Sequence, residues 1–253
     1  MSWRPTDCHA HSTHSDGSMS VAEVAERGAA LGVRVSVSDH ISRDAPTTLT
    51  SVEAIDSYLT DLEQYDVLRG GEFCWHDALW RELPDALVAR FTHRLGSLHS
   101  VALPGGASCR AFVRELPPGV TPAMYVEGLV TSLEQLAREM PVDILAHPTI
   151  IPPAARVLDP ETLWTEELED RVVAALASSG IAFELSARYA PHRRLVERIA
   201  SAGIRFSLGS DGHLREQVGV ITAPLELARS IGVKDQELYN PEVHGSRTGA
   251  FGA

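Results

Sequence analysis

The chain has 253 residues, of which 44% are hydrophobic and 22% are charged, and its formal net charge is −12. This composition is ordinary for a globular protein, and the length suits one large domain, such as an α/β barrel, or two small ones. The acidic balance leaves no surplus of positive charge for a phosphate backbone. It therefore argues against nucleic acid as the main partner, while a local basic patch or bound cations would still alter the balance.

The cysteines and the N-terminus indicate the compartment. Cys8, Cys74 and Cys109 are odd in number and form no C-x-x-C pair, which argues against a disulfide framework. The first five residues hold no apolar signal region, and no apolar run reaches the length of a membrane span. We therefore expect a cytoplasmic protein that does not enter a membrane. The sequence does not indicate its oligomeric state.

Segments with the alternation of a strand are followed by segments with the apolar spacing of a helix. The predicted strands cover residues 5–9, 33–38, 67–73, 93–101, 142–146, 181–185 and 204–208. The predicted helices cover residues 20–31, 50–65, 77–91 on both sides of Pro84, 122–140, 166–179, 191–202 and 222–231.

Local signals support several of these helix boundaries. Ser20 and Glu23 have the spacing of a capping box, and so do Thr50 and Glu53. Pro191 suits the first turn of the helix that it begins.

Strand–helix units in series imply parallel strands joined by right-handed crossovers, which favours an α/β barrel. No break in composition divides the chain, so residues 1–231 are interpreted as a single domain. The loops over residues 103–119 and 149–160 are rich in proline. Residues 232–253 form a polar C-terminal tail that we expect to be partly disordered.

A short stretch near the N-terminus, residues 7–17, reads DCHAHSTHSDG. Residues i and i+2 of an extended strand point to the same face, so His9 and His11 would present two imidazoles side by side. Imidazole is a favoured ligand of zinc, iron and other transition metals. A lone His-x-His is weak evidence, but the later predicted strands also end at, or close to, a His, Asp or Glu.

Active sites of α/β barrels lie at the carboxyl ends of the strands. The residues that the pattern places there are His9, His11, Asp16, Asp39, His40, Glu72, His99, His147, Asp211 and His213. Strand ends that are far apart in sequence converge in a closed barrel, so these residues describe one ring of nitrogen and oxygen ligands. The ring is too large for one zinc ion, which takes about four ligands. It suits two or three metal ions with a bridging carboxylate.

The motifs in this ring resemble those of the PHP (polymerase and histidinol phosphatase) family. In chain order they are DCHAHSTHSDG (7–17), SDH (38–40), GGE (70–72), GSLHS (96–100), AHP (146–148) and GSDGH (209–213). The resemblance covers roughly residues 5–215. The motifs GSLHS and GSDGH favour the histidinol-phosphatase branch. It implies a distorted (β/α)7 barrel, similar to a TIM barrel, that holds up to three metal ions.

The resemblance also implies how the ligands are shared among the ions. The first ion would have the ligands His9, His11, Glu72 and Asp211. The second would share Glu72 and add His99 and His147. The third would have the ligands Asp16, His40 and His213. Glu72, His99 and Asp211 are the candidate catalytic residues, and the ligand types fit zinc, manganese and iron alike.

Clustered metal ions lower the pKa of bound water and supply hydroxide near neutral pH. A hydroxide between two ions can attack phosphorus in line, and a third ion can neutralise the phosphoryl oxygens. The family resemblance therefore implies hydrolysis of a small phosphate monoester. Histidinol phosphate, nucleotides and sugar phosphates are the candidate substrates, and such an ester is the expected partner.

Three alternatives stay open. The same metal ions and hydroxide could cut a C–N or C–O bond, or iron in the ring could carry out redox chemistry. The ring could also be a non-catalytic, metal-stabilised module. The complete ligand set and the lack of an attached polymerase domain argue against that last alternative.

Three residues are candidates for substrate binding. Arg188 follows the sixth predicted strand, and arginine suits bidentate recognition of phosphate. Arg43, three residues after His40, is a weaker candidate. His192 stands at a predicted helix start and could reach the mouth of the barrel as a proton donor.

Four further residues near the ligands receive structural interpretations. We interpret His14 as a solvent-exposed or supporting histidine, and Asp39 as a structural carboxylate beside a ligand. Cys8 is expected to pack away from the ligands, in the barrel wall, and Cys74 could line the site without binding metal.

Overall fold

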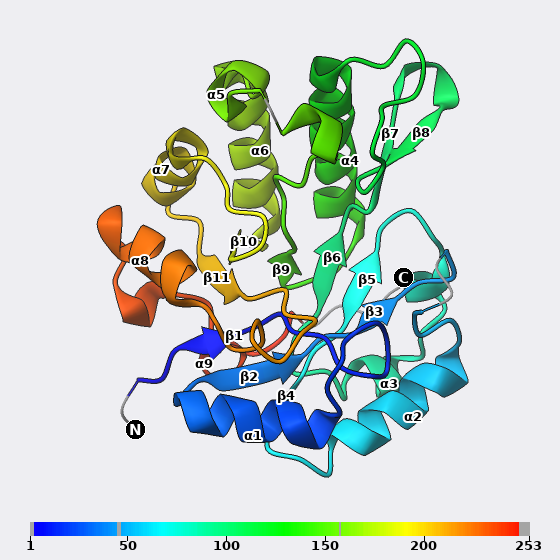
Figure 1. Ribbon diagram of the computed structural model, residues 1–253, viewed down its shortest axis with the longest axis vertical. Helices are drawn as coiled ribbons and strands as arrows, with labels where there is room; N and C mark the ends of the chain where they lie inside the picture. Colours follow the sequence, from blue (N-terminus) through cyan, green and yellow to red (C-terminus); the bar gives the residue numbers. More distant parts are fainter. Residues whose placement is uncertain (1–2, 45–46, 157, 248–253) are drawn as a thin grey trace.

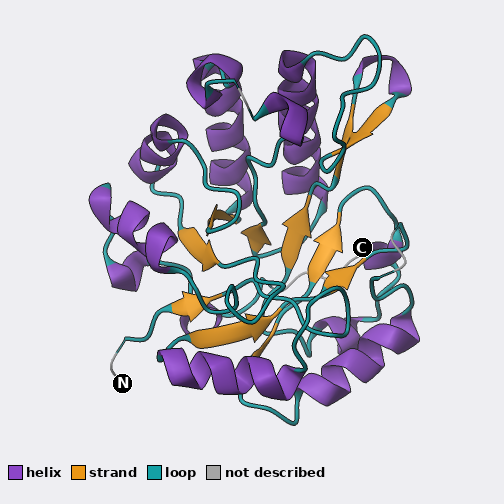
Figure 2. Cartoon of the chain, in the orientation of Figure 1, coloured by secondary structure: helices purple, strands orange, loops and turns teal. Residues whose placement is uncertain are grey.

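Parallel strands alternate with helices along the chain, as the sequence predicts (Figures 1 and 2). The computed structural model describes residues 3–44, 47–156 and 158–247. The parallel strands are β1 (Thr6–Asp7), β2 (Arg34–Val37), β3 (His40–Ile41), β4 (Leu68–Arg69), β5 (Glu72–Cys74), β6 (Leu95–Ser97), β9 (Ile144–Leu145), β10 (Ala182–Ser186) and β11 (Phe206–Gly209).

Helices follow most of these strands and lie on the outside of the sheets (Figure 2). The α-helices are α1 (Val21–Leu31), α2 (Val52–Leu62), α3 (Asp85–Val88), α4 (Pro122–Glu139), α5 (Pro160–Leu163), α6 (Glu166–Ser179), α7 (Arg193–Ser201), α8 (Thr222–Ser230) and α9 (Pro241–His244). Short 3-10 helices cover Leu79–Arg81, Pro104–Gly106, Pro153–Ala155 and Asp235–Glu237.

The strands form a distorted barrel rather than one continuous sheet. A three-stranded sheet has the order β1-β2-β4, and a six-stranded sheet has the order β11-β10-β9-β6-β5-β3. The sheets are joined because β2 runs on into β3, and β4 runs on into β5. Backbone hydrogen bonds from Cys8 N to Leu208 O (2.8 Å) and from Asp211 N to His9 O (2.8 Å) then link the first strand to the last. The predicted fold class is confirmed.

The helix starts show which local predictions hold. Ser20 and Glu23 form the predicted capping box of α1. The prediction that Thr50 caps the next helix is wrong, because the Ser51 hydroxyl accepts the hydrogen bond from Ala54 N and the helix begins one residue later. Pro191 does not enter the first turn of α7 either, because His192 is the N-cap of that helix.

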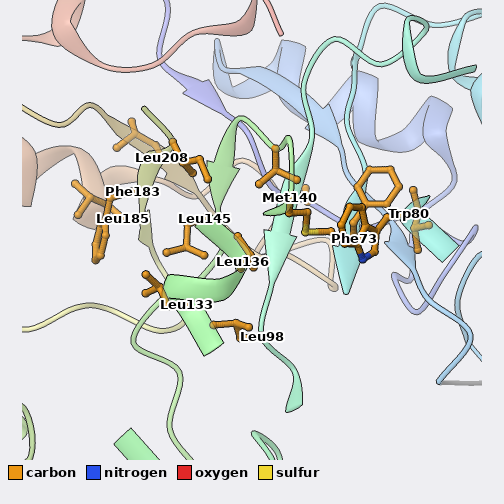
Figure 3. Close-up of a cluster of buried hydrophobic side chains, with 14 of the residues drawn as sticks. Phe73, Trp80, Leu98, Leu133, Leu136, Met140, Leu145, Phe183, Leu185 and Leu208 are labelled. Carbon is orange, nitrogen blue, oxygen red and sulfur yellow. The ribbon is translucent and has the colours of Figure 1, made fainter. Parts of the chain in front are cut away.

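The residue alternation of the strands divides the interior into two apolar groups. Side chains that point outward pack under the helices, and Figure 3 shows Leu133 and Leu136 of α4 beside Leu145, with Phe183 and Leu185 of β10 in the same layer. Side chains that point inward form a smaller cluster of Cys8, Leu95, Ile144, Ala146, Ala182 and Tyr239. This inner cluster fills the barrel below the polar residues of the strand ends.

The predicted loop over residues 103–119 contains a strand of a β-hairpin. Strand β7 (Ser100–Ala102) pairs with β8 (Ser108–Arg110) in antiparallel register. The hairpin packs against α4 at Gly128, where an added Cβ atom would lie 2.4 Å from the carbonyl oxygen of Ala102. The absence of a side chain there lets the hairpin project from the carboxyl end of the barrel (Figure 1).

Residues 232–247 close the amino end of the barrel, opposite to the strand ends that carry the histidines. Tyr239 is buried, and its backbone N–H donates to the carbonyl oxygen of Phe206 at the start of β11 (2.7 Å). Asp143, just before β9, accepts hydrogen bonds from Ser246 Oγ (2.8 Å) and Arg247 N (2.5 Å). This part of the predicted tail is therefore an ordered part of the fold, and it does not cover the mouth. Among the described residues, no helix is both long enough and apolar enough to cross a membrane.

Candidate metal centre

Nine predicted ligands converge at the carboxyl end of the barrel. Each of them belongs to at least one group of side chains whose nitrogen or oxygen atoms lie within 4.8 Å of one another. The nine residues are His9, His11, Asp16, His40, Glu72, His99, His147, Asp211 and His213. They come from the ends of almost every strand of the ring, so the convergence is a product of barrel closure.

The first group joins the first strand to the last. His9 Nε2 and His11 Nε2 lie 3.2 Å apart, and His11 Nε2 lies 3.2 Å from Asp211 Oδ1. The Oε2 atom of Glu72 lies 3.5 Å from His9 Nε2. All four side chains are buried or nearly so, which leaves a small polar centre shielded from bulk water.

The second group surrounds the other oxygen of the same carboxylate. Glu72 Oε1 lies 2.9 Å from His147 Nε2 and 3.1 Å from His99 Nε2, and these two ring nitrogens lie 3.3 Å apart. One carboxylate therefore faces two separate groups of imidazoles, as a bridging ligand would.

The third group lies nearer to solvent. Asp16 Oδ1 lies 3.4 Å from His40 Nε2 and 3.3 Å from His213 Nε2, and the Asp16 side chain is 37% exposed. His11 also belongs to this group, so it connects the outer ligands with the buried ones.

Glu184 orients two of the ligands from the middle of β10. Its Oε1 atom lies 2.8 Å from His9 Nδ1, and its Oε2 atom accepts a hydrogen bond from the backbone N–H of His147 (2.5 Å). A carboxylate in that position accepts a hydrogen bond from Nδ1–H of His9, so the lone pair on Nε2 points toward the other candidate ligands. Gly209 makes room for this carboxylate, because a Cβ atom there would lie 2.0 Å from Glu184 Oε1.

Two ligands are held by a backbone that most residues avoid. His147 has a φ of 30° and Asp211 has a φ of 49°, and they are the only non-glycine residues with positive φ in the described chain. Such conformations cost free energy and concentrate at functional sites. The bonds from His147 N to Glu184 and from Asp211 N to His9 O hold these two turns in place.

Within this group of candidate ligands, burial and the attraction between opposite charges shift the pKa values in opposite directions. Burial raises the pKa of Glu72, but the neighbouring His40 and His99 outweigh this effect and hold it well below the usual range. Burial lowers the pKa of His40, yet the Glu72 carboxylate, 2.5 Å from Nδ1, raises it to about 9. Burial, with the nearby His40, lowers the pKa of His11 to about 3. The ring therefore holds both an ionised carboxylate and imidazoles that differ strongly in basicity.

The donor set fits divalent metal ions. Imidazole nitrogens and carboxylate oxygens are the usual ligands of zinc, manganese and iron. Facing Nε2 atoms 3.2–3.3 Å apart, each beside a carboxylate oxygen, satisfy one another poorly as hydrogen-bond partners. The buried Nδ1 atom of His11 has no hydrogen-bond partner among the described residues. Cations between these atoms would bind the lone pairs that accept no hydrogen bond from the described residues.

A cavity of about 290 Å³ opens over the ring. We call it the main cavity. Arg188 and Tyr189 line one side, and Arg110 and Phe112, beside the β7–β8 hairpin, line it too. Arg188 Nη1 lies 2.9 Å from His213 Nδ1 and 3.8 Å from Asp211 Oδ1, next to the third group. Arg188 therefore lies in the main cavity beside the third group, and its role in binding phosphate stays a prediction.

The structure does not bring the other two predicted substrate residues into the main cavity. Arg43 makes a bidentate ion pair with Glu82, with both oxygens at 2.6 Å, and does not line the cavity. A carboxylate already matches the Arg43 guanidinium, and a role of Arg43 in substrate binding stays a prediction. His192 Nε2 lies 2.6 Å from the buried Glu169, and His192 lines an adjacent cavity instead.

The supporting residues lie where the sequence interpretation puts them. His14 stays outside the ring and pairs with Asp61 at 2.8 Å. Asp39 is buried and accepts hydrogen bonds from the N–H (2.8 Å) and hydroxyl (2.6 Å) of Ser12, which fixes the turn that carries Asp16. Cys8 packs away from the candidate ligands, in the inner apolar cluster of the barrel, and Cys74 lines the main cavity.

Several residues of the site were missed in the sequence. Glu184 stands in an otherwise apolar strand, IAFEL, and a lone carboxylate in a buried strand is the signal that could have marked it. Phe112, Tyr189 and Arg110 lie in loops or at a hairpin, where no periodic pattern indicates which side chains face inward.

Comparisons with known proteins agree on the fold. Neither a protein-family model nor a curated protein matches the chain. Among solved structures, a histidinol phosphate phosphatase from Lactococcus lactis, complexed with zinc, L-histidinol and phosphate, is 15% identical and has a TM-score of 0.68. The alignment covers 92% of this chain and 95% of that one. A proposed histidinol phosphatase from Listeria monocytogenes is 13% identical with a TM-score of 0.70, over 87% of this chain and 99% of that one. The chain therefore has the α/β barrel fold of these phosphatases.

Proposed function

We propose that the protein is a metal-dependent phosphatase that hydrolyses a small phosphate monoester and belongs to the PHP family. The observation that carries the proposal is the two-sided contact of Glu72. One oxygen faces His9 and His40 and the other faces His99 and His147, at distances of 2.5–3.5 Å, at the mouth of the barrel. The fold shared with two structures described as histidinol phosphatases supports the same chemistry.

We assign the ligands to ions by the three groups. His9, His11, Glu72 and Asp211 would hold one ion, Glu72, His99 and His147 a second, and Asp16, His40 and His213 a third. Divalent ions held there would lower the pKa of water and neutralise phosphoryl oxygens. The chain itself supplies the geometry, because Glu184 fixes the His9 tautomer and Asp39 fixes the turn that carries Asp16.

The main cavity limits the size and charge of the substrate. Its volume of about 290 Å³ admits a small ester but not a folded macromolecule. Arg188 stands at its rim without a carboxylate closer than 3.8 Å, so its guanidinium can bind a phosphoryl oxygen beside the third group. The three cysteines are free and buried, which supports the cytoplasm as the place of action.

The test is phosphate release from the purified protein after loading with Mn²⁺, Zn²⁺ or Fe²⁺. The substrate panel contains p-nitrophenyl phosphate, sugar phosphates, nucleoside monophosphates and histidinol phosphate. We expect turnover on at least one class of ester, and at least a ~100-fold loss in His99→Ala, since even outer-shell changes cost 10- to 100-fold.

A matched control is His244→Ala at the opposite end of the barrel, where the imidazole accepts a hydrogen bond from Asn240 N and stacks on the Tyr239 ring. This variant should keep both metal content and turnover. Two or three bound ions per chain with no phosphate release from any ester would overturn the proposal. That outcome would favour hydrolysis of a C–N or C–O bond, or redox chemistry if the bound metal were iron.

A further inference from the structure

A second cavity, of about 240 Å³, lies beside the main cavity and shares Arg188 and Tyr189 with it. We call it the annex. Arg156, Arg188 and His192 line it, and no aspartate or glutamate does so among the described residues. This is unusual in a chain with a net charge of −12. The annex is thus a local concentration of positive charge next to the metal ring.

The two guanidinium groups are held against one aromatic ring. The Cζ atom of Arg156 lies 5.3 Å from the centre of the Tyr189 ring, and that of Arg188 lies 5.5 Å from it. Both distances are within the range of a cation–π contact, which positions a guanidinium without neutralising it. Two like charges on one ring repel each other, and an anion between or beside them would relieve that repulsion.

Arg156 differs from most arginines of this chain in its partners. Its Nε donates to the carbonyl oxygen of Ile151 (3.2 Å), and no carboxylate lies within ion-pair distance of it in the described chain. By contrast, Arg171 pairs with Glu127 and Glu134, and Arg43 pairs with Glu82. The exposed guanidinium of Arg156 therefore keeps donors available for a ligand.

Helix α7 begins at the same cavity. His192 is its N-cap, and the His192 side chain makes no hydrogen bond to the amides of the first turn. Unsatisfied amides and the helix dipole favour an anion at such an end. His192 Nε2 is held by the buried Glu169, so its ring stays fixed in the wall.

We propose that the annex is a subsite for a second anionic group of the substrate. This inference rests on the proposed function, because it takes the scissile phosphate to lie at the metal ring, on the main-cavity side of Arg188. The second group lies on the annex side, between Arg188 and Arg156. The preferred substrates are then phosphate esters that carry a second phosphate or a carboxylate. Trp164 and Ile151, which also line the annex, would contact the carbon skeleton. An ester with a cationic amine, such as histidinol phosphate, is disfavoured by the same arginines.

The experiment compares matched pairs of esters that differ by one anionic group. The pairs are fructose 1,6-bisphosphate with fructose 6-phosphate, and 3-phosphoglycerate with glycerol 3-phosphate. We expect kcat/KM for the ester with two anionic groups to exceed that of its partner by about tenfold or more, the size of one good charged contact. The preference should shrink as salt is raised.

Variants of Arg156 assign the preference to the annex. Arg156→Ala should reduce the ratio of the two kcat/KM values to near one, and Arg156→Lys should keep part of it because the charge remains. Arg138→Ala is the control, since Arg138 is an exposed arginine in the last turn of α4. It removes one positive charge elsewhere and should leave the ratio unchanged. A ratio near one in the unmodified protein, or a ratio that survives Arg156→Ala, would overturn the inference.

A binding measurement separates failure of the subsite from failure of the proposed function. If neither these esters nor any ester of the substrate panel above is hydrolysed, the proposed function fails. The fructose phosphates are then titrated by calorimetry into the same metal-loaded protein, which leaves them unhydrolysed. At least fivefold tighter binding of the bisphosphate, lost in Arg156→Ala, would support the subsite independently, and equal binding of the two esters would rule it out.

Discussion

The two ends of the barrel both bury charged groups, but they satisfy them in different ways. At the amino end, Asp143 accepts hydrogen bonds from Arg94 N, Ser246 Oγ and Arg247 N at 2.5–2.8 Å, and Arg94 Nε lies 3.8 Å away. At the carboxyl end, imidazole lone pairs and carboxylates face one another around shared points, as at Glu72 and His147.

The difference shows that the partners of a buried charged group indicate its role. A carboxylate whose oxygens are all met by donors of the chain needs nothing else, and its role is to hold elements together. A group of acceptors that face one another needs a cation from outside the chain. Mutations at the amino end should therefore change stability, and mutations at the carboxyl end should change metal content and turnover.

The largest expected effect at the carboxyl end comes from Glu72→Gln. The amide keeps the shape but loses the charge that faces both groups of imidazoles, so at least one ion should be lost per chain. We expect turnover to fall at least ~100-fold, beyond the range produced by outer-shell changes. Metal content by mass spectrometry and phosphate release would check this, and full metal content in the variant would contradict the bridging role.

At the amino end, Asp143→Ala should lower the free energy of unfolding by about 3 kcal/mol, because it removes the acceptor of three hydrogen bonds and the carboxylate 3.8 Å from Arg94 Nε. Urea denaturation of metal-loaded protein measures this effect. Asp143→Asn, which keeps an acceptor oxygen, should lose less. Turnover at 25 °C should change less than twofold in both variants, and a large loss of kcat without a loss of stability would break the comparison.

Glu184→Gln tests the residue that orients ligands without being one. The amide keeps one acceptor oxygen but places its NH2 group against either His9 Nδ1–H or His147 N–H, so one of these two residues must turn. Metal affinity should fall by roughly 10- to 100-fold, while stoichiometry at saturating metal is kept. Chelator competition measures the affinity, and an unchanged value would show that the His9 tautomer is set by other groups.

The pH dependence of metal binding follows from the basic imidazoles. The Glu72 carboxylate outweighs burial and raises the pKa of His40 to about 9, so metal-free protein carries a proton there at pH 7. A metal ion must displace this proton. The apparent affinity for metal should therefore rise as the pH increases toward 9. Below pH 9 it should decrease by about tenfold per pH unit for each displaced proton. Chelator competition at pH 6.5, 7.5 and 8.5 measures the slope, and a flat profile would contradict this charge state.

The smallest effect is expected from Tyr239→Phe at the amino end. It removes one hydrogen bond, from the hydroxyl to the carbonyl oxygen of Gly245 (2.9 Å), and leaves the ring in the inner apolar cluster. The free energy of unfolding should fall by about 1 kcal/mol. Metal content should not change, and a loss of bound ions would show that the two ends are coupled more tightly than the comparison allows.

Much of this molecule can be predicted from local sequence. The alternation of strand and helix patterns indicates the barrel, and strand ends in a barrel must converge, so residues as distant as His9 and Asp211 could be grouped before any coordinates. The candidate ligands can be named from the sequence because His and Asp at strand ends are chemically distinctive.

What could not be predicted depends on contacts between distant segments. Strand β8 lies in a stretch rich in proline and glycine and exists because it pairs with β7, which packs on α4. Arg43 lies three residues after a ligand, yet Glu82 binds its guanidinium. Arg156 and Tyr189 meet across two loops, and no periodicity indicates such a contact.

The first group of ligands lies where the barrel closes, since His9 and His11 follow the first strand, and Asp211 follows the last. An ion held there would cross-link segments near the two ends of the chain. It would lower the conformational entropy of the unfolded state by closing a very long loop. Metal supply would then govern folding as well as chemistry. A chain made under metal starvation should open by parting its first strand from its last, long before its helices unfold.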